Sequence, residues 1–190
     1  LQALPSAFSG NTFSGNSSEA IALNGATLSS DFTLPNPGLP YVVLSSIAVS
    51  PTGPSIVPTL TIEPGTVLRF APGTGLSIGG TFPAVLLVPG TPTHPITFTS
   101  SSAAPAPGNW NGLTLWNTTP TTRLEHCVIE YGGADWTDAG LTLASSAPTI
   151  RRCTIRRSDG FGILWWNGDG TVTENTITEN VYGILVNFTQ

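Results

Sequence analysis

Carboxylates are the first residues of this chain whose type and spacing could support chemistry. They form two sets: Asp135, Asp138, Asp159 and Asp169 among turn residues, and Glu125, Glu130, Glu174 and Glu179 on one repeated segment. Glycan-cleaving enzymes use such acids to bind a cation or as general acid and base. Asp135 and Asp138 lie beside Trp136 in a Gly-rich loop, where the alternatives are a calcium site, a sugar subsite or an ordinary polar loop. The polar loop is favoured, because the local spacing supplies no third ligand.

An internal repeat in the second half of the chain indicates how these residues are positioned. Segments 124–131, 150–157 and 172–179 align at offsets of 26 and 22 residues, and a second set of similar segments begins at Gly140, Gly162 and Gly183. Each segment is short, β-rich and followed by turn formers. A period near 22 without helices predicts a parallel β-solenoid, in which equivalent residues stack one coil apart. We therefore expect Ile129, Ile155 and Ile177 to form one buried column.

The same alignment pairs the basic residues with acids. Four arginines fall close together and could be read as an anion site. In the register of the repeat each lies one coil from a glutamate: Arg151 and Glu125, Arg156 and Glu130, Arg152 and Glu174, and Arg157 and Glu179. The interpretation favoured here is a set of cross-strand ion pairs that stabilise the stack.

The only two cysteines, Cys127 and Cys153, share one inward column with Asn175. Parallel neighbours about 4.8 Å apart lie within the Cα separation that a disulfide allows. The alternatives are a disulfide formed in an oxidising compartment and two thiols packed as small apolar groups. Neither thiol is a candidate nucleophile, because no histidine is placed to activate it.

Tryptophans are the remaining candidates for recognition. Trp165 falls in an inward column, so its neighbour Trp166 points outward, in the same column as Trp116. Outward indoles could stack on sugar rings or pack against a neighbouring subunit, and the alternative is scattered surface aromatics. Trp116, Trp136 and Trp166 are therefore candidate glycan- or partner-stacking residues.

Several runs resemble a known family. These runs are TLTIEPGTVLRF, HPITFTS, GNWNGL, HCVIEYGG and the repeated NTIT-type turn. They resemble secreted bacterial right-handed parallel β-helix repeat proteins of pectate-lyase-like architecture, over residues 55–190. The resemblance implies an all-β, right-handed parallel β-helix, here of about five or six coils, but not one activity, because the architecture hosts lyases, hydrolases, adhesins and inert stalks. We place an N-terminal extended arm with the first strands in residues 1–40, with partner binding as one role for it, and the β-helix domain in residues 41–190. Residues 100–111, rich in Pro and Ser, are expected to bulge from a corner.

Composition excludes other classes. Only 9% of the 190 residues are charged, the net charge is −5, and 21 Gly and 17 Pro are scattered, which excludes a helical bundle. A negative chain is a poor partner for nucleic acid, and no apolar run reaches the roughly 20 residues of a membrane span. The start at Leu1, without a basic leader, is expected for a mature extracellular or cell-surface protein. Asn16, Asn117 and Asn187 lie in glycosylation sequons.

The apolar ends of the chain suggest self-association. The N-terminal arm carries Leu1, Leu4, Phe8 and Phe13, and the last segment carries Ile184, Val186 and Phe188 with no evident cap. Because an uncapped coil is a template for another strand, we expect a non-enzymatic structural protein that forms a head-to-tail homopolymer, a filament or surface fibre, without cofactor or metal. One alternative is a domain of a longer stalk or adhesin, in which further coils follow Gln190. The other is a secreted polysaccharide-binding or polysaccharide-cleaving β-helix.

Overall fold

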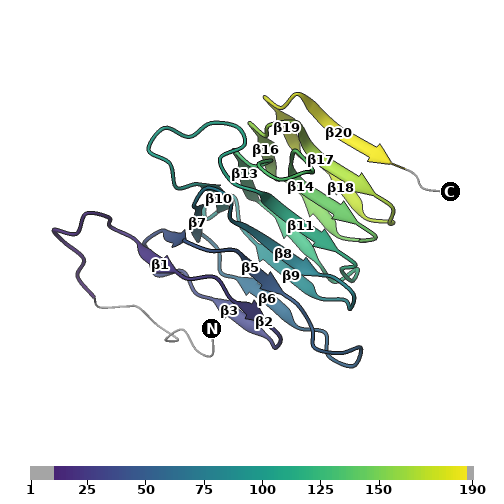
Figure 1. Cartoon of the computed structure of the whole chain (residues 1–190), viewed down its shortest axis with the longest axis horizontal. Helices are drawn as coiled ribbons and strands as arrows, with labels where there is room; N and C mark the ends of the chain where they lie inside the picture. Colours follow the sequence, from purple (N-terminus) through teal and green to yellow (C-terminus); the bar gives the residue numbers. More distant parts are fainter. Residues whose placement is uncertain (1–10, 188–190) are drawn as a thin grey trace.

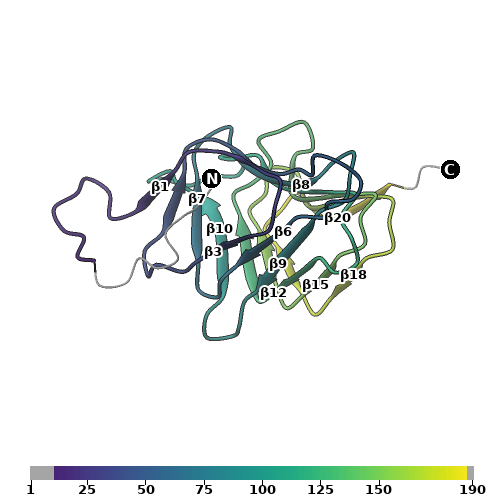
Figure 2. The same cartoon turned by 90° about the horizontal axis from the view of Figure 1, so that it is seen from below.

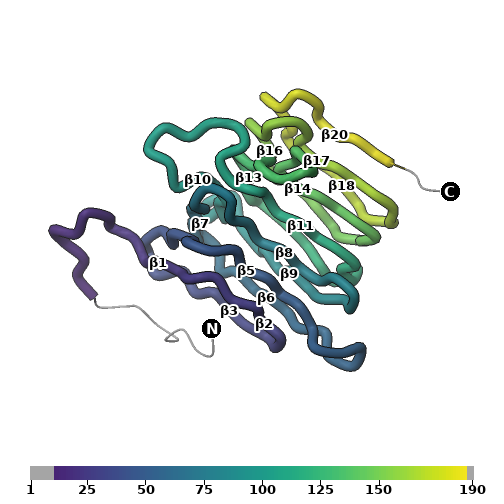
Figure 3. Tube along the Cα trace, viewed as in Figure 1, coloured from purple at the N-terminus to yellow at the C-terminus, as the bar shows by residue number. Residues whose placement is uncertain are grey.

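The computed structural model describes residues 11–187, which form a solenoid of parallel strands without a helix in this range. The chain passes in turn through three sheets, A, B and C, and then returns to sheet A one coil further on. The coils follow each other along one axis, from the purple N-terminal coil to the yellow C-terminal coil (Figures 1 and 3). Figure 2 shows the strands of sheet C side by side, in sequence from the N-terminal coil to the C-terminal coil. The predicted fold class, a right-handed parallel β-helix, is confirmed.

Each sheet takes every third strand of the chain. Sheet A consists of β1 (Ile21–Leu23), β4 (Tyr41–Val43), β7 (Val67–Phe70), β10 (Ile96–Ser100), β13 (Cys127–Glu130), β16 (Thr154–Arg156) and β19 (Thr176–Thr178). Sheet B consists of β2 (Thr27–Leu28), β5 (Ile47–Val49), β8 (Gly75–Gly79), β11 (Gly112–Trp116), β14 (Ala139–Ala144), β17 (Phe161–Trp166) and β20 (Tyr182–Asn187). Sheet C consists of β3 (Phe32–Leu34), β6 (Thr59–Ile62), β9 (Val85–Pro89), β12 (Arg123–Glu125), β15 (Thr149–Arg151) and β18 (Thr171–Thr173). The described chain thus makes six coils and adds two further strands.

The predicted register is confirmed in the second half of the chain. Ile155 pairs with Ile129 on one side and with Ile177 on the other. Trp165 stands between Leu143 and Val186, as the alternation of inward and outward residues predicts. Stacking of apolar side chains along these columns forms the core, since burial of their surface is the main force that holds parallel coils together.

The β-helix begins before residue 40, where the sequence analysis places the boundary between arm and domain. Strands β1, β2 and β3 pair with β4, β5 and β6 and complete a first coil. These strands are only two or three residues long, so the alternation that marks longer strands is hardly visible in them. Longer strands follow in the next coils, where β6, β7 and β8 and then β9, β10 and β11 pass through sheets C, A and B.

The loop between β10 and β11 protrudes from one corner, as expected for residues 100–111, and is drawn in teal in Figure 1. Its end, however, turns back into the core. Trp110 is fully buried, stacks on Phe70 with ring centroids 4.2 Å apart, and donates a hydrogen bond from Nε1 to the carbonyl oxygen of Glu130 at 2.8 Å. Trp110 therefore closes the corner between sheets A and B, a role that the sequence analysis missed.

Three corner columns hold non-glycine residues in the left-handed region, with φ between 46° and 65°. They are Asn117, Ser145 and Asn167; His126, Arg152 and Glu174; and Tyr131, Arg157 and Glu179. Such a conformation costs about 1–2 kcal/mol per residue. The corners retain it because their N–H groups donate to the next coil, for example Ser145 to the carbonyl oxygen of Trp166 at 2.8 Å.

The two ends of the described solenoid differ in how their core residues are covered. The inward leucines of the first coil, Leu23, Leu28 and Leu34, are buried. At the other end Ile184 and Val186, on β20, are exposed by 43% and 42%. The C-terminal coil therefore presents the open end of the core column within residues 11–187.

Candidate functional site

The outer face of sheet B carries the three candidate tryptophans. Trp136 stacks on Trp166, with ring centroids 5.0 Å apart and planes inclined by 23°. Trp116 lies in the same outward column as Trp166, with Ala144 between them. The structure thus brings two of the three predicted indoles into contact and places the third about 10 Å along the same face, two strand spacings away. Trp136 and Trp116 remain 74% and 55% exposed, so the ring face of Trp136 that is turned away from Trp166 and much of the Trp116 ring are available to a ligand.

The loop that carries Trp136 folds back over sheet B and is held by its own polar groups. Asp135 Oδ1 accepts hydrogen bonds from the amide of Thr137 at 3.0 Å and from its hydroxyl group. Thr142 points outward on β14 but is buried beneath this loop, and its hydroxyl donates to Thr137 Oγ1 at 3.0 Å. The Asp135 carboxylate therefore fixes the loop, as the polar-loop interpretation predicts. Within residues 11–187, no group of three His, Cys, Asp or Glu side chains could hold a metal ion.

A shallow groove of about 170 Å³ adjoins this loop. Its polar lining consists of Ser46, Ser77, Asn111, Thr114 and Asp135. Hydroxyl, amide and carboxylate groups of this kind can hydrogen-bond the hydroxyl groups of a sugar, while the neighbouring indoles supply apolar faces. The groove and the tryptophans together form the candidate ligand surface of the described chain.

All four predicted ion pairs are present. The nitrogen–oxygen distances are 3.2 Å for Arg151 and Glu125, 2.6 Å for Arg152 and Glu174, 2.8 Å for Arg156 and Glu130, and 2.6 Å for Arg157 and Glu179. Glu130 also accepts a hydrogen bond from Thr99, one coil earlier. Because the partners remain partly exposed and solvent screens their charges, each pair makes only a modest contribution to stability. The arginine cluster therefore links coils, and its guanidinium groups are already engaged by carboxylates.

One of these pairs yields a prediction about pH. The hydrogen bond from Arg152 and its positive charge hold the pKa of Glu174 below its ordinary value. The pair therefore stabilises the fold above the unfolded-state pKa of about 4.3, and this contribution is lost as the pH falls through the lower folded-state pKa. We expect Arg152→Gln to raise the pKa of Glu174 toward 4.3, as measured by NMR titration of the glutamate carboxyl carbons. Arg123→Gln is the control, because Arg123 forms no ion pair with the residues described and its loss should leave Glu174 unchanged.

The cysteines lie in the inward column that the alignment predicts. Their sulfur atoms are 3.1 Å apart and both side chains are buried. In the structure they are thiols.

The remaining site candidates are distributed over the surface. Asn16 is exposed, Asn187 ends β20, and Asn117 donates from Nδ2 to the carbonyl oxygens of Gly80 and Thr81 at 3.4 Å. A glycan on Asn117 would replace one of the two hydrogen atoms on Nδ2 and so remove at least one of these hydrogen bonds. Phe13 lines a hollow of about 500 Å³ on the outer face of sheet A. The arm residues Leu1, Leu4 and Phe8, and Phe188 at the other end, lie outside the described residues.

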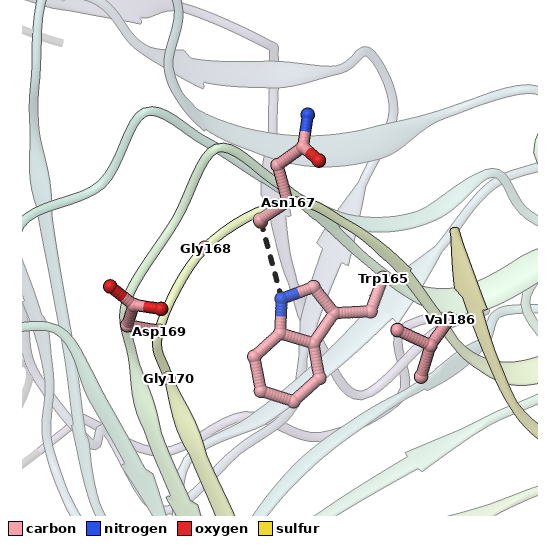
Figure 4. A pocket seen from close by; sticks show the side chains of 6 residues that line it. All are labelled: Trp165, Asn167, Gly168, Asp169, Gly170 and Val186. Carbon is pink, nitrogen blue, oxygen red and sulfur yellow. Dashed lines mark hydrogen bonds between the residues drawn. The ribbon is translucent and has the colours of Figure 1, made fainter. Parts of the chain in front are cut away.

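A second hollow, of about 610 Å³, lies at the open C-terminal end of the core. Figure 4 shows Trp165 and Val186 on one side and the turn at Gly168–Gly170 on the other. The indole is fixed because Nε1 donates to the carbonyl oxygen of Asn167 at 3.2 Å. An apolar wall and a polar rim thus meet at the edge where a further coil would stack.

Comparison with known proteins agrees with this architecture. A family model described as a pectate-lyase like beta helix domain matches residues 37–144, from the approach to β4 through β14. No curated protein and no solved structure matches the chain. No helix in the described range is long and apolar enough to cross a membrane. With three parallel sheets in a continuous solenoid and this match over more than half of its length, the chain belongs to the pectate-lyase-like β-helix family.

Proposed function

We propose that this β-helix is a non-enzymatic, extracellular structural protein whose C-terminal coil associates head to tail with the N-terminal coil of a second copy. The observation that carries the proposal is the open core at that end, where Ile184, Val186 and Tyr182 expose much of their apolar surface. Strands β18, β19 and β20 are also the last of their sheets among the described residues. Unpaired strand edges beside exposed apolar side chains favour the addition of further strands.

The N-terminal edge strands of a second copy can pair with this C-terminal edge. Its first coil presents the outer edges of β1, β2 and β3, one for each sheet. All strands run parallel, so stacking one copy on the next continues all three sheets in the same direction. A contact between two different faces does not close on itself and therefore propagates into a filament. The use of the arginines and glutamates in links between coils is consistent with a structural role.

Sedimentation velocity and electron microscopy over a range of concentrations test the association. We expect the wild-type protein to form elongated polymers and Val186→Lys to remain monomeric, because the variant places a charge in the open core. Trp116→Lys is the matched control, since Trp116 is 55% exposed on the outer face of β11, between the two ends of the solenoid, and it should polymerise like the wild type. Circular dichroism should show the same β-sheet signal for all three. A wild-type protein that stays monomeric at high concentration contradicts the proposal.

A second candidate function is polysaccharide binding on the outer face of sheet B. The stacked pair Trp136 and Trp166 beside the polar groove supports it. Because the chain carries a net charge of −5 and Asp135 lines the groove, neutral glycans fit this surface better than acidic ones. Affinity electrophoresis against neutral and acidic glycans should show retardation that Trp136→Ala and Trp166→Ala abolish without loss of folding. If no glycan retards the wild-type protein, this candidate is excluded.

A further inference from the structure

One inward column, at the corner between sheets C and A, contains the groups that connect successive coils. Its members are Cys127 at the start of β13, Cys153 directly before β16 and Asn175 directly before β19. All three occupy the same position in successive coils, because the strands that follow them are paired in register. The link between one pair of coils at this position is therefore equivalent to the link between the next pair.

Asn175 joins the last coil to the one before it. Its Oδ1 accepts a hydrogen bond from the amide of Cys153, and its Nδ2 donates to the carbonyl oxygen of Ile150, both at 2.9 Å. One side chain thus satisfies two main-chain groups that the corner leaves without strand partners, and buried groups of this kind need such partners. At this level of the column the link between coils is an amide.

One coil earlier, the equivalent link lies between two sulfur atoms. The Cys127 thiol donates to Cys153 Sγ at 3.1 Å, and Cys153 Sγ lies 3.4 Å from the carbonyl oxygen of Leu124. Leu124 occupies the position that Ile150 has for Asn175, since the two residues are paired. The thiols are only 2% and 1% exposed, so no water or ligand separates them from each other.

We propose that Cys127 and Cys153 are an oxidative cross-linking site, whose disulfide joins these two coils covalently where Asn175 joins the next two by hydrogen bonds. Two thiols lose two protons and two electrons and form one S–S bond. The electrons pass to a disulfide oxidant, such as glutathione disulfide or a dithiol oxidase, which is reduced to two thiols. The sulfur atoms need to approach by only about 1 Å to reach bonding distance.

The burial of the two thiols determines when the cross-link forms. Because both sulfur atoms are sealed in the folded core, the reaction takes place before β16 docks on β13, and reductants have little access to the finished bond. The thiolate of one cysteine attacks the oxidant and forms a mixed disulfide, from which the thiolate of the other cysteine then displaces the oxidant.

Refolding the full chain in a glutathione redox buffer tests the cross-link. We expect an intact mass lower by two hydrogen atoms, and no alkylation by iodoacetamide in guanidinium unless a reductant is added. Two alkylated cysteines without reductant overturn the proposal, and so does a mixed disulfide with glutathione or a disulfide between chains as the main product.

The thermal stability of oxidised and reduced protein gives an independent readout. A disulfide that closes a loop of this length should raise the Tm by about 10 °C relative to protein that was reduced while unfolded. The control is Cys153→Asn, which offers the amide of Cys127 and the carbonyl oxygen of Leu124 the same two hydrogen bonds that Asn175 makes one coil later. This variant should fold, and its Tm should not depend on the oxidant. An equal Tm for oxidised and reduced wild-type protein contradicts a stabilising cross-link.

Discussion

Replacing Trp110 with alanine should lower the free energy of unfolding by about 3–5 kcal/mol. The indole is fully buried and stacks on Phe70, and its Nε1–H group satisfies the carbonyl oxygen of Glu130. Its removal leaves a large cavity at the corner between sheets A and B and an unpaired carbonyl group. Equilibrium unfolding in guanidinium, followed by circular dichroism, measures the change.

Two variants identify the origin of that loss. Trp110→Phe keeps an aromatic ring on Phe70 but loses the hydrogen bond, so its cost should be smaller than that of Trp110→Ala. Trp136→Ala removes an indole that is 74% exposed and should have little effect. Similar losses at Trp110 and Trp136 would show that the corner loop does not insert Trp110 into the core.

The Ile155→Ala variant should lose about 2–5 kcal/mol of stability. Ile155 is fully buried between Ile129 and Ile177, so the cavity has core residues on both sides along the column. Ile177→Ala is the matched control. It removes the same groups from the same column, but on β19, the partly exposed last strand of sheet A. We expect Ile177→Ala to lower the free energy of unfolding by less than half as much, since Ile177 buries less apolar surface in the folded state.

Thermal and denaturant unfolding of the two isoleucine variants test the register directly. If Ile155→Ala and Ile177→Ala cost the same small amount, position 155 does not face the core. A shift of one residue would have this effect, because it turns every side chain of the strand to the opposite face.

The predictability of the fold depends on how regular the coils are. In the second half, Cys127, Cys153 and Asn175 mark coils of similar length, and the alignment alone predicts the inward columns and the ion pairs. In the first half, the offset between paired strands of sheet A varies from 20 residues for β1 and β4 to 30 for β7 and β10, so no single period aligns the coils. The first coil, β1–β3, falls within residues 1–40, where the sequence predicts an arm and the first strands but not a complete coil, because a strand this short is defined by its neighbours in space and not by its own sequence.

The candidate site was predictable only where it follows the repeat. Trp116 and Trp166 share an outward column because β11, β14 and β17 are in register. The stack of Trp136 on Trp166 depends on the path of a corner loop, which the hydrogen bonds of Asp135 and Thr137 determine. Trp110 was missed for the same reason: a Pro-rich loop predicts a protruding segment, and only a single aromatic residue just before the next strand hints at its return to the core.

The arrangement of neighbouring coils also determines how this molecule bears a mechanical load. Each strand pairs only with the strands one coil before and one coil after it, so the hydrogen bonds of the three sheets join neighbouring coils alone. Tension between the two ends of the described solenoid therefore breaks the hydrogen bonds of one terminal coil at a time and detaches that coil from the stack. Measured along sheet A, the coils contain between 20 and 31 residues, so each coil that detaches releases on the order of 70 to 100 Å of extended chain. The solenoid would consequently lengthen in successive steps under load and dissipate energy at every step, while the coils still stacked keep their structure.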